Sequence, residues 1–316
     1  MSGDHLHQRD HGHRHVHDHG RSTLTQRAAL ASVGMALFLL GLKSWAAIET
    51  GSVAMLGSLA DTGLDIMASL VTLYSVRFAA QPADGDHRFG HGKAESLAAL
   101  FQTGIIVASA MAIGWRGISR IGSSETPTHP ELGIGVSVIA IITTFALILY
   151  QRSVVRRTGS IAIQADHVHY SSDLLLNASV IAALVLDTIL GVRGADPLFG
   201  VAIAAWLVWH AREVARGAID QLMDKEWPEE KREQFMAIAG SHPDLQGIHD
   251  VRTRSSGAHD FAQFHVWVDP EKTVREIHGA MDELEAKLLE AFPGTEVIIH
   301  PEPDDQDAAC SEQAAP

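Results

Sequence analysis

The chain has 316 residues, which is enough for a membrane part and one small soluble domain. Its formal net charge of −14 argues against nucleic acid as a partner, because phosphate binding needs basic patches. The single cysteine, Cys310, excludes an intramolecular disulfide and a zinc site made of cysteines.

The beginning of the chain, residues 1–24, is predicted to form a flexible cytoplasmic tail rich in histidine. Its histidines mostly alternate with other residues: His5, His7, His11, His13, His15, His17 and His19. Alternate imidazoles on a flexible chain can chelate borderline cations, so the pattern favours weak metal capture. An inert tail is the alternative.

Six apolar stretches follow, each long enough or nearly so to cross a bilayer, which takes about 20 residues. They are Ala28–Ile48, Ser52–Val76, Leu97–Ile118, Leu132–Gln151, Asp173–Leu190 and Pro197–Ala215. Basic residues concentrate before the first stretch and after the second, fourth and sixth. The positive-inside rule therefore predicts six transmembrane helices over residues 25–218, with both termini in the cytoplasm.

After the sixth stretch the hydropathy falls to that of a soluble domain, predicted over residues 219–303. Periodicity favours the order helix, strand, strand, helix, strand, an α+β layer with helices on one face of a sheet. The elements are expected at Pro228–Ala239, Ile248–Arg254, Phe261–Val268, Val274–Ala291 and Val297–Ile299, with Ser255–Gly257 as the turn between the first two strands. Residues 304–316 are acidic and are expected to be disordered.

Two pairs of polar residues indicate a metal site at membrane depth. Asp61 and Asp65 are four residues apart in the second stretch, so they share one helix face. His169 and Asp173 repeat this spacing where the fifth stretch begins. A charged side chain in hydrocarbon costs about 2.5–3.5 kcal/mol, so intramembrane charges are functional by default. Three carboxylates and one imidazole suit tetrahedral zinc. A structural polar pair is the alternative, and the position of His169 and Asp173 near a loop allows it.

Two further groups of candidate ligands lie outside the apolar stretches. The loop after the second stretch holds Asp84, His87 and His91, whose short spacing among glycines allows a surface metal site but is also that of an ordinary turn. The soluble domain carries a larger set on or near its strands: His249, His265, His278, His300 and Glu302. Histidines on a small domain are usually surface residues, so the sequence allows two interpretations of this set: a metal site or ordinary surface residues.

Three segments together resemble the cation diffusion facilitator family, and within it the bacterial zinc and ferrous-iron efflux branch. They are Ser58–Asp65, Gln81–Ser96 and His169–Asp173, and the resemblance covers about residues 28–303. It implies a homodimer with six spans per subunit. It also implies a cytoplasmic αββαβ domain similar to a metallochaperone, and exchange of metal for protons.

The resemblance also assigns roles to the candidate residues. The four intramembrane residues would form the transport site, the three loop residues a second site, and the five soluble-domain residues a site for a pair of zinc ions at the dimer interface. Lys93 and Asp224 would form a charge interlock near the dimer axis. Glu302 stands where aspartate is usual in this branch, and Pro301 where glutamine is. The extra methylene of Glu302 shifts its carboxylate, so the choice between one and two metals stays open.

The sequence thus predicts a divalent-cation efflux transporter of the cell inner membrane, not an enzyme. Imidazole favours Zn²⁺ over manganese and magnesium, with Fe²⁺ and Cd²⁺ next. A histidine must be neutral to bind metal, so binding expels a proton and favours metal/proton antiport by alternating access. The expected partners are a second copy, divalent ions, protons and the lipid bilayer; no cofactor is expected apart from transported and regulatory Zn²⁺.

A membrane-anchored metal sensor or storage protein is the alternative. A membrane metalloprotease is disfavoured because the chain has no His-Glu-x-x-His motif.

Overall fold

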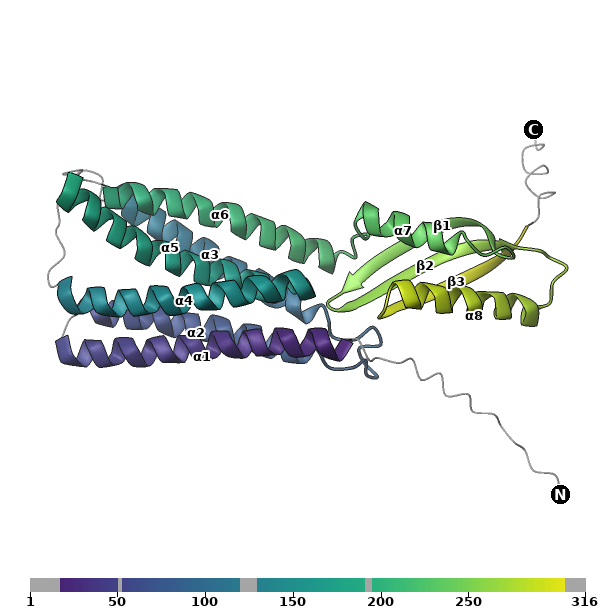
Figure 1. Cartoon of the computed structure of the whole chain (residues 1–316), viewed down its shortest axis with the longest axis horizontal. Coiled ribbons are helices and arrows are strands. Elements are labelled where there is room, and N and C mark those ends of the chain that lie inside the picture. Colours follow the sequence, from purple (N-terminus) through teal and green to yellow (C-terminus); the bar gives the residue numbers. More distant parts are fainter. Residues whose placement is uncertain (1–17, 51–52, 120–129, 191–194, 305–316) are drawn as a thin grey trace, which may run out of the picture.

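The computed structural model describes residues 18–50, 53–119, 130–190 and 195–304. The side chains of some residues within these ranges, Asp61 among them, lie outside the description, as do the histidines of residues 1–17. Six long helices lie side by side, and a smaller unit of two helices and three strands lies beyond one end of them, near the start of α1 (Figure 1). The predicted fold class is confirmed: a helical membrane domain is followed by an αββαβ domain.

The membrane domain consists of α1 (Asp18–Thr50), α2 (Val53–Ala79), α3 (Ala94–Ser119), α4 (Pro130–Thr158), α5 (Ile161–Leu190) and α6 (Ala195–Leu222). Within the described residues, four stretches are long and apolar enough to cross a membrane: Gly20–Glu49, Ala94–Ser119, Val138–Thr158 and Pro197–Leu222. The intramembrane candidate ligands belong to the other two helices, α2 and α5.

The start of α1 differs from the prediction. The helix begins at Asp18, so residues 18–24 are helical and do not belong to a flexible tail. The guanidinium of Arg21 donates a hydrogen bond to the backbone oxygen of Thr158 at 3.1 Å, and Thr25 is buried. This first turn of α1 is therefore held against the end of α4.

The start of α5 also differs, by three helical turns. α4 ends at Thr158 and is followed by Gly159, whose φ of +66° is a left-handed conformation that glycine adopts without a steric penalty. α5 then begins at Ile161, with the hydroxyl of Ser160 accepting from the backbone N–H of Ile163 at 3.3 Å. α5 therefore extends three turns before the apolar stretch predicted from Asp173, because residues 164–173 are too polar to resemble a membrane helix.

Small side chains allow α3 and α6 to approach closely. A Cβ added at Gly117 of α3 would lie 3.0 Å from the backbone oxygen of Pro197, and Gly200 of α6 faces the same point. Buried residues of α3, α5 and α6 form one apolar core, which includes Ile106 and Leu207. A second core joins α1, α2, α4 and α5.

The soluble unit contains α7 (Glu229–Ala239), β1 (Gln246–Ser256), β2 (His259–Val268), α8 (Val274–Ala291) and β3 (Thr295–Pro303). The sheet has the order β1-β2-β3, with β1 antiparallel and β3 parallel to β2. α8 spans the predicted range, and the Thr273 and Glu276 side chains form a capping box at its start. The turn between β1 and β2 is shorter than predicted, because Ser255 and Ser256 pair with β2 and leave only residues 257–258 unpaired.

One face of this sheet is covered and the other is not. Ala262, Phe264 and Val266 of β2 are buried in a core with residues of α7 and α8, such as Phe235 and Leu284. Strand side chains alternate between faces, so residues 263, 265 and 267 of β2 lie on the opposite face. His265 is therefore on the face that the helices leave open.

The two units meet where the loop between α2 and α3 touches the tip of the β1–β2 hairpin. A Cβ added at Gly92 would lie 2.2 Å from the backbone oxygen of Ser256, so only glycine allows this approach. The ring of Phe89 packs edge-on against Phe261 with centroids 5.8 Å apart, and the guanidinium of Arg254 lies 4.5 Å from the centroid of each ring.

We expect Gly92→Ala to loosen this contact, because the clashing atom belongs to the backbone and cannot rotate away. Overpacking of this kind costs about 1–3 kcal/mol. Hydrogen exchange of residues 255–259 should accelerate in the variant. Gly85→Ala is the matched control, since a Cβ at Gly85 meets nothing within 4 Å. Exchange at the wild-type rate in Gly92→Ala would show that the contact is not part of the structure in solution.

Candidate metal centres

The first candidate centre lies inside the membrane domain, between α2 and α5. The Nε2 of His169 lies 3.0 Å from the Oδ1 of Asp65, and their side chains are only 7% and 16% exposed. Ligand atoms of Asp65, His169 and Asp173 all lie within 4.8 Å of one another. Asp61 lies one turn before Asp65 on α2, with its side chain outside the description. Three of the four predicted residues are thus brought together.

The position of this cluster within α5 argues against helix capping as the role of its residues. His169 and Asp173 lie more than two turns inside α5, so neither can cap its start. A carboxylate and an imidazole in contact, with a second carboxylate beside them, offer oxygen and nitrogen donors to a cation. Mixed donors of this kind suit zinc.

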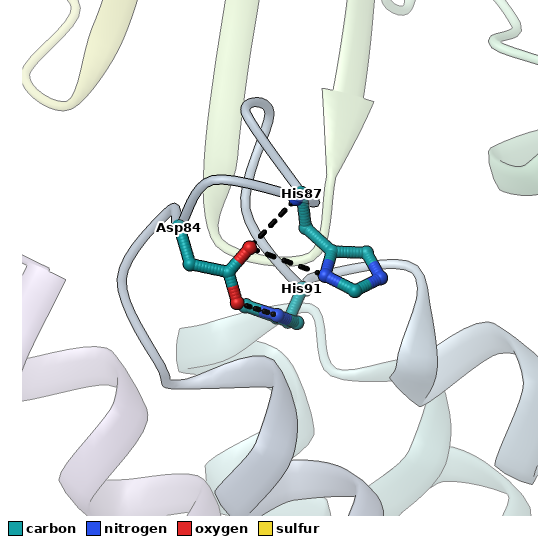
Figure 2. Close-up of side chains that lie close together, drawn as sticks. All are labelled: Asp84, His87 and His91. Carbon is teal, nitrogen blue, oxygen red and sulfur yellow. Dashed lines mark hydrogen bonds and ion pairs between the residues drawn. The ribbon is translucent and has the colours of Figure 1, made fainter.

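The second candidate centre is in the loop between α2 and α3, where Asp84 lies between two histidines (Figure 2). One oxygen of its carboxylate is 3.3 Å from the Nδ1 of His87, and the other is 3.3 Å from the Nε2 of His91. The His91 side chain is 2% exposed, whereas Asp84 is 53% exposed. His91 is fixed edge-on against the Phe78 ring at 4.6 Å. All three predicted loop residues are therefore brought together.

The local backbone holds the Asp84 carboxylate in place. The backbone N–H of His87 donates to its Oδ1 at 2.6 Å, and that of Asp86 donates to the same atom at 3.0 Å. The His87 hydrogen bond is the main reason that the pKa of the Asp84 carboxyl lies below its usual range, and partial desolvation opposes it. The carboxylate is thus ionised at neutral pH.

The third candidate centre lies on the open face of the soluble sheet. The register places His249 of β1 opposite His265 of β2, and His265 beside His300 of β3. The carboxylate of Glu302 bridges two of them: one oxygen is 3.0 Å from His249 Nε2 and the other 2.8 Å from His265 Nδ1. The His300 ring is 4.8 Å from that of His265 but is not part of this three-residue group.

His278 lies apart from this group. It is on α8, exposed, and its Nδ1 is 3.2 Å from the Asp282 carboxylate. Within one subunit, the structure therefore does not bring His278 to the other predicted ligands.

Hydrogen bonds determine the charge at this third centre. Those from His265 and then His249 hold the pKa of Glu302 below its usual range. The Nδ1–H of His249 donates to the backbone oxygen of Gly247 at 2.8 Å, and this bond, followed by Glu302, raises the His249 pKa. With Nδ1 held in this way, Nε2 is the atom that His249 can offer to a metal.

The sequence prediction missed Asp250 as a neighbour of this centre. Strand alternation would place it on the face opposite His249, but the pairing of β1 with β2 is irregular on both sides of His249 and Asp250 has a φ of +46°. This bulge turns the Asp250 carboxylate to within 3.8 Å of His265. No periodicity in the sequence signals such a bulge.

The predicted pair of Lys93 and Asp224 is present, and it includes a third residue. The Lys93 ammonium is 3.0 Å from the Asp224 carboxylate, which also accepts from Arg254 at 3.3 Å. Desolvation would raise the pKa of Asp224, but the hydrogen bonds from Lys93 and Arg254 outweigh it and hold the pKa below its usual range. Since Arg254 also packs on the rings of the loop, one side chain links the end of α6, the loop and the sheet.

Comparisons with known proteins agree with this division of the chain. The family model for the cation efflux transmembrane domain matches residues 29–223, and that for the cytoplasmic domain of cation efflux proteins matches residues 227–304. The cation-efflux pump FieF of Serratia proteamaculans is 41% identical over 280 residues, covering 89% of this chain and 93% of its own length. FieF of Cronobacter sakazakii is 42% identical over 286 residues, covering 90% and 94%.

The zinc form of CzrB is 35% identical and covers 26% of this chain and 96% of its own, with a TM-score of 0.24.

These matches cover the six long helices and the soluble unit together. They confirm the predicted multi-pass membrane protein with a cytoplasmic C-terminal domain, and a transporter in place of an enzyme. The chain belongs to the cation efflux family, the cation diffusion facilitators that the sequence resembles.

Proposed function

We propose that the protein exports divalent cations, Zn²⁺ foremost, from the cytoplasm in exchange for protons. The transport site is formed by Asp61, Asp65, His169 and Asp173. The observation that carries this proposal is the cluster of Asp65, His169 and Asp173 inside the bundle. A sensor or a storage protein has no need of ligands at membrane depth, whereas a transporter must hold its cargo midway.

Proton exchange follows from the chemistry of the same ligands. His169 and Asp65 are in hydrogen-bond contact, which requires a proton between them. A cation bound there takes the place of one proton of the His169 imidazolium, because a histidine side chain must be neutral to act as a ligand. Metal arriving from the cytoplasm therefore releases a proton, and protons arriving from outside release the metal.

The protein acts as a homodimer in the inner membrane, with the soluble domain as the regulatory part. FieF pumps, named for cation efflux, are similar over nearly the whole chain. The open face of the sheet carries His249, His265 and Glu302, and metal bound there would stabilise whichever dimer arrangement completes its coordination. The loop residues Asp84, His87 and His91 form a further site where metal enters from the cytoplasm.

We expect Asp65→Ala to abolish zinc uptake into proteoliposomes. The change removes a ligand and leaves His169 without its partner, so the loss should exceed the roughly 10–100-fold that removal of an outer-sphere partner costs. Glu49→Ala, an exposed acid at the far end of α1, is the control and should transport normally. Full zinc transport by a folded Asp65→Ala dimer would exclude this site.

We expect His169→Asp to shift selectivity from zinc towards manganese, because oxygen-only sites suit the harder cation. It should also flatten the pH dependence of release, since the imidazole that exchanges its proton is gone. Uptake of both metals, measured between pH 6 and 8, tests this. Selectivity and pH profile identical to wild type would remove His169 from the mechanism.

We expect zinc affinity at the cytoplasmic site to fall on acidification, with the decline starting above the ordinary histidine pKa of about 6.5. His249 has a raised pKa, so it stays protonated to a higher pH than a free histidine and competes with zinc there. The effect of pH on folding stability, measured without metal, has the opposite sign. The His249–Glu302 pair contributes its full stabilisation below the ordinary histidine pKa, and this stabilisation is lost as pH rises through the raised pKa of His249.

Calorimetric titration of an Asp65→Ala, His91→Ala background isolates this site. Its affinity should drop between pH 8 and 6, and adding His249→Ala should weaken both the affinity and its pH dependence. An affinity that is constant over this range would contradict the assignment of His249 as a ligand.

A further inference from the structure

A second acid, Asp166, lies fully buried on α5 without being one of the proposed ligands. It is 0% exposed and lies three residues before His169, on the side towards the cytoplasmic end of the helix. A carboxylate inside a membrane domain is costly unless its hydrogen bonds are satisfied. Its partners therefore show what it does.

Two glutamines from other helices donate to Asp166. The Nε2 of Gln102, on α3, donates to its Oδ1 at 3.0 Å, and the Nε2 of Gln151, on α4, donates to its Oδ2 at 2.8 Å. Both glutamines are at most 1% exposed, so neither amide has access to water instead. The carboxylate consequently ties α5 to α3 and α4 at one point.

Both amides are themselves held in place. The hydroxyl of Thr72, on α2, donates to the Oε1 of Gln102 at 3.3 Å. The Nε2 of Gln151 also donates to the hydroxyl of Ser32, on α1, at 3.0 Å. The network around Asp166 therefore links α5 to α1, α2, α3 and α4.

A second anchor lies on the other side of His169 in the sequence. The hydroxyl of the fully buried Tyr170 donates to the backbone oxygen of Ser32 at 3.0 Å and lies 2.9 Å from the hydroxyl of Ser69. This contact ties α5 to α1 and α2. His169 is thus flanked by two buried polar anchors, and the helix cannot rotate without breaking both.

We propose that Asp166 is a positioning residue for transport: held by Gln102 and Gln151, it fixes the rotation of α5 that presents His169 and Asp173 to Asp65. Residues seven apart on an α-helix return to nearly the same face, so Asp166 and Asp173 share one stripe, with His169 beside it. This inference rests on the proposed function, because it assigns a role within that transport site.

Two variants test whether transport depends on the hydrogen bonds of Asp166 or only on the presence of an acidic residue. Asp166→Leu has a similar shape but leaves two buried amide donors without an acceptor. Loss of hydrogen bonds to a charged acceptor corresponds to at least about a tenfold effect, so zinc uptake should fall by that factor with a raised KM. The double variant Asp166→Asn with Gln151→Glu keeps the acid count and both hydrogen bonds of position 166: Gln102 donates to the new amide oxygen, and the new amide nitrogen donates to the carboxylate now at position 151. It should return to within about threefold of wild type.

Gln102→Met removes one donor while retaining the side chain's volume, and serves if Asp166→Leu does not fold. It should raise the KM for zinc by about threefold or more. Ser179→Ala is the control on the same helix, since its hydroxyl donates to the backbone oxygen of Leu176 in that helix, and it should change nothing.

Uptake and equilibrium zinc binding of the detergent-solubilised dimers are both measured for every variant. If the wild type binds zinc but does not transport it, the proposed function fails, and the binding data still test the positioning role. The inference is overturned if the folded Asp166→Leu or Gln102→Met protein binds and transports zinc like the wild type. It is equally overturned if the double variant is no better than Asp166→Leu.

Discussion

The interior of the helix bundle provides no water for a charged group, so every charge placed there must be satisfied by another part of the protein. The contact between Asp65 of α2 and His169 of α5 meets this requirement, and the arrangement of the bundle follows from it. α2 and α5 must stay adjacent, and α5 must keep the rotation that the buried hydrogen bonds of Asp166 and Tyr170 define. The same pair is satisfied by a proton or by a cation, which is why we assign the exchange to it.

The candidate centres outside the bundle obey a different constraint, because they are in contact with water. Asp84 and Glu302 have pKa values below their usual range owing to hydrogen bonds and not to burial, so they are charged and accessible at neutral pH. The loop centre belongs to the same loop as Gly92 and Phe89, which contact the β1–β2 hairpin. The other centre lies on the sheet that contains this hairpin. A cation bound at either centre can therefore influence how the soluble domain sits on the bundle.

The sequence predicted features that depend on local pattern and missed those that depend on long-range contacts. The range Val274–Ala291 was correct because its periodicity and capping box are local. The start of α5 was wrong because its polar first turns are stabilised by partners on other helices, such as Gln102, that hydropathy cannot reveal. Asp250 was missed because a β-bulge reverses the strand alternation, and Arg254 because its partners are distant in the chain.

Simultaneous recording of zinc and proton fluxes tests the central claim most directly. Wild-type protein is reconstituted into liposomes that contain a zinc-sensitive dye and a pH-sensitive dye, and zinc is added outside with no pH gradient imposed. The account predicts that zinc entry acidifies the outside and alkalinises the lumen in a fixed proportion, and that an imposed outward proton gradient accelerates zinc entry. Zinc entry without any change in luminal pH, or at a rate independent of the proton gradient, would contradict exchange at the Asp65–His169 pair.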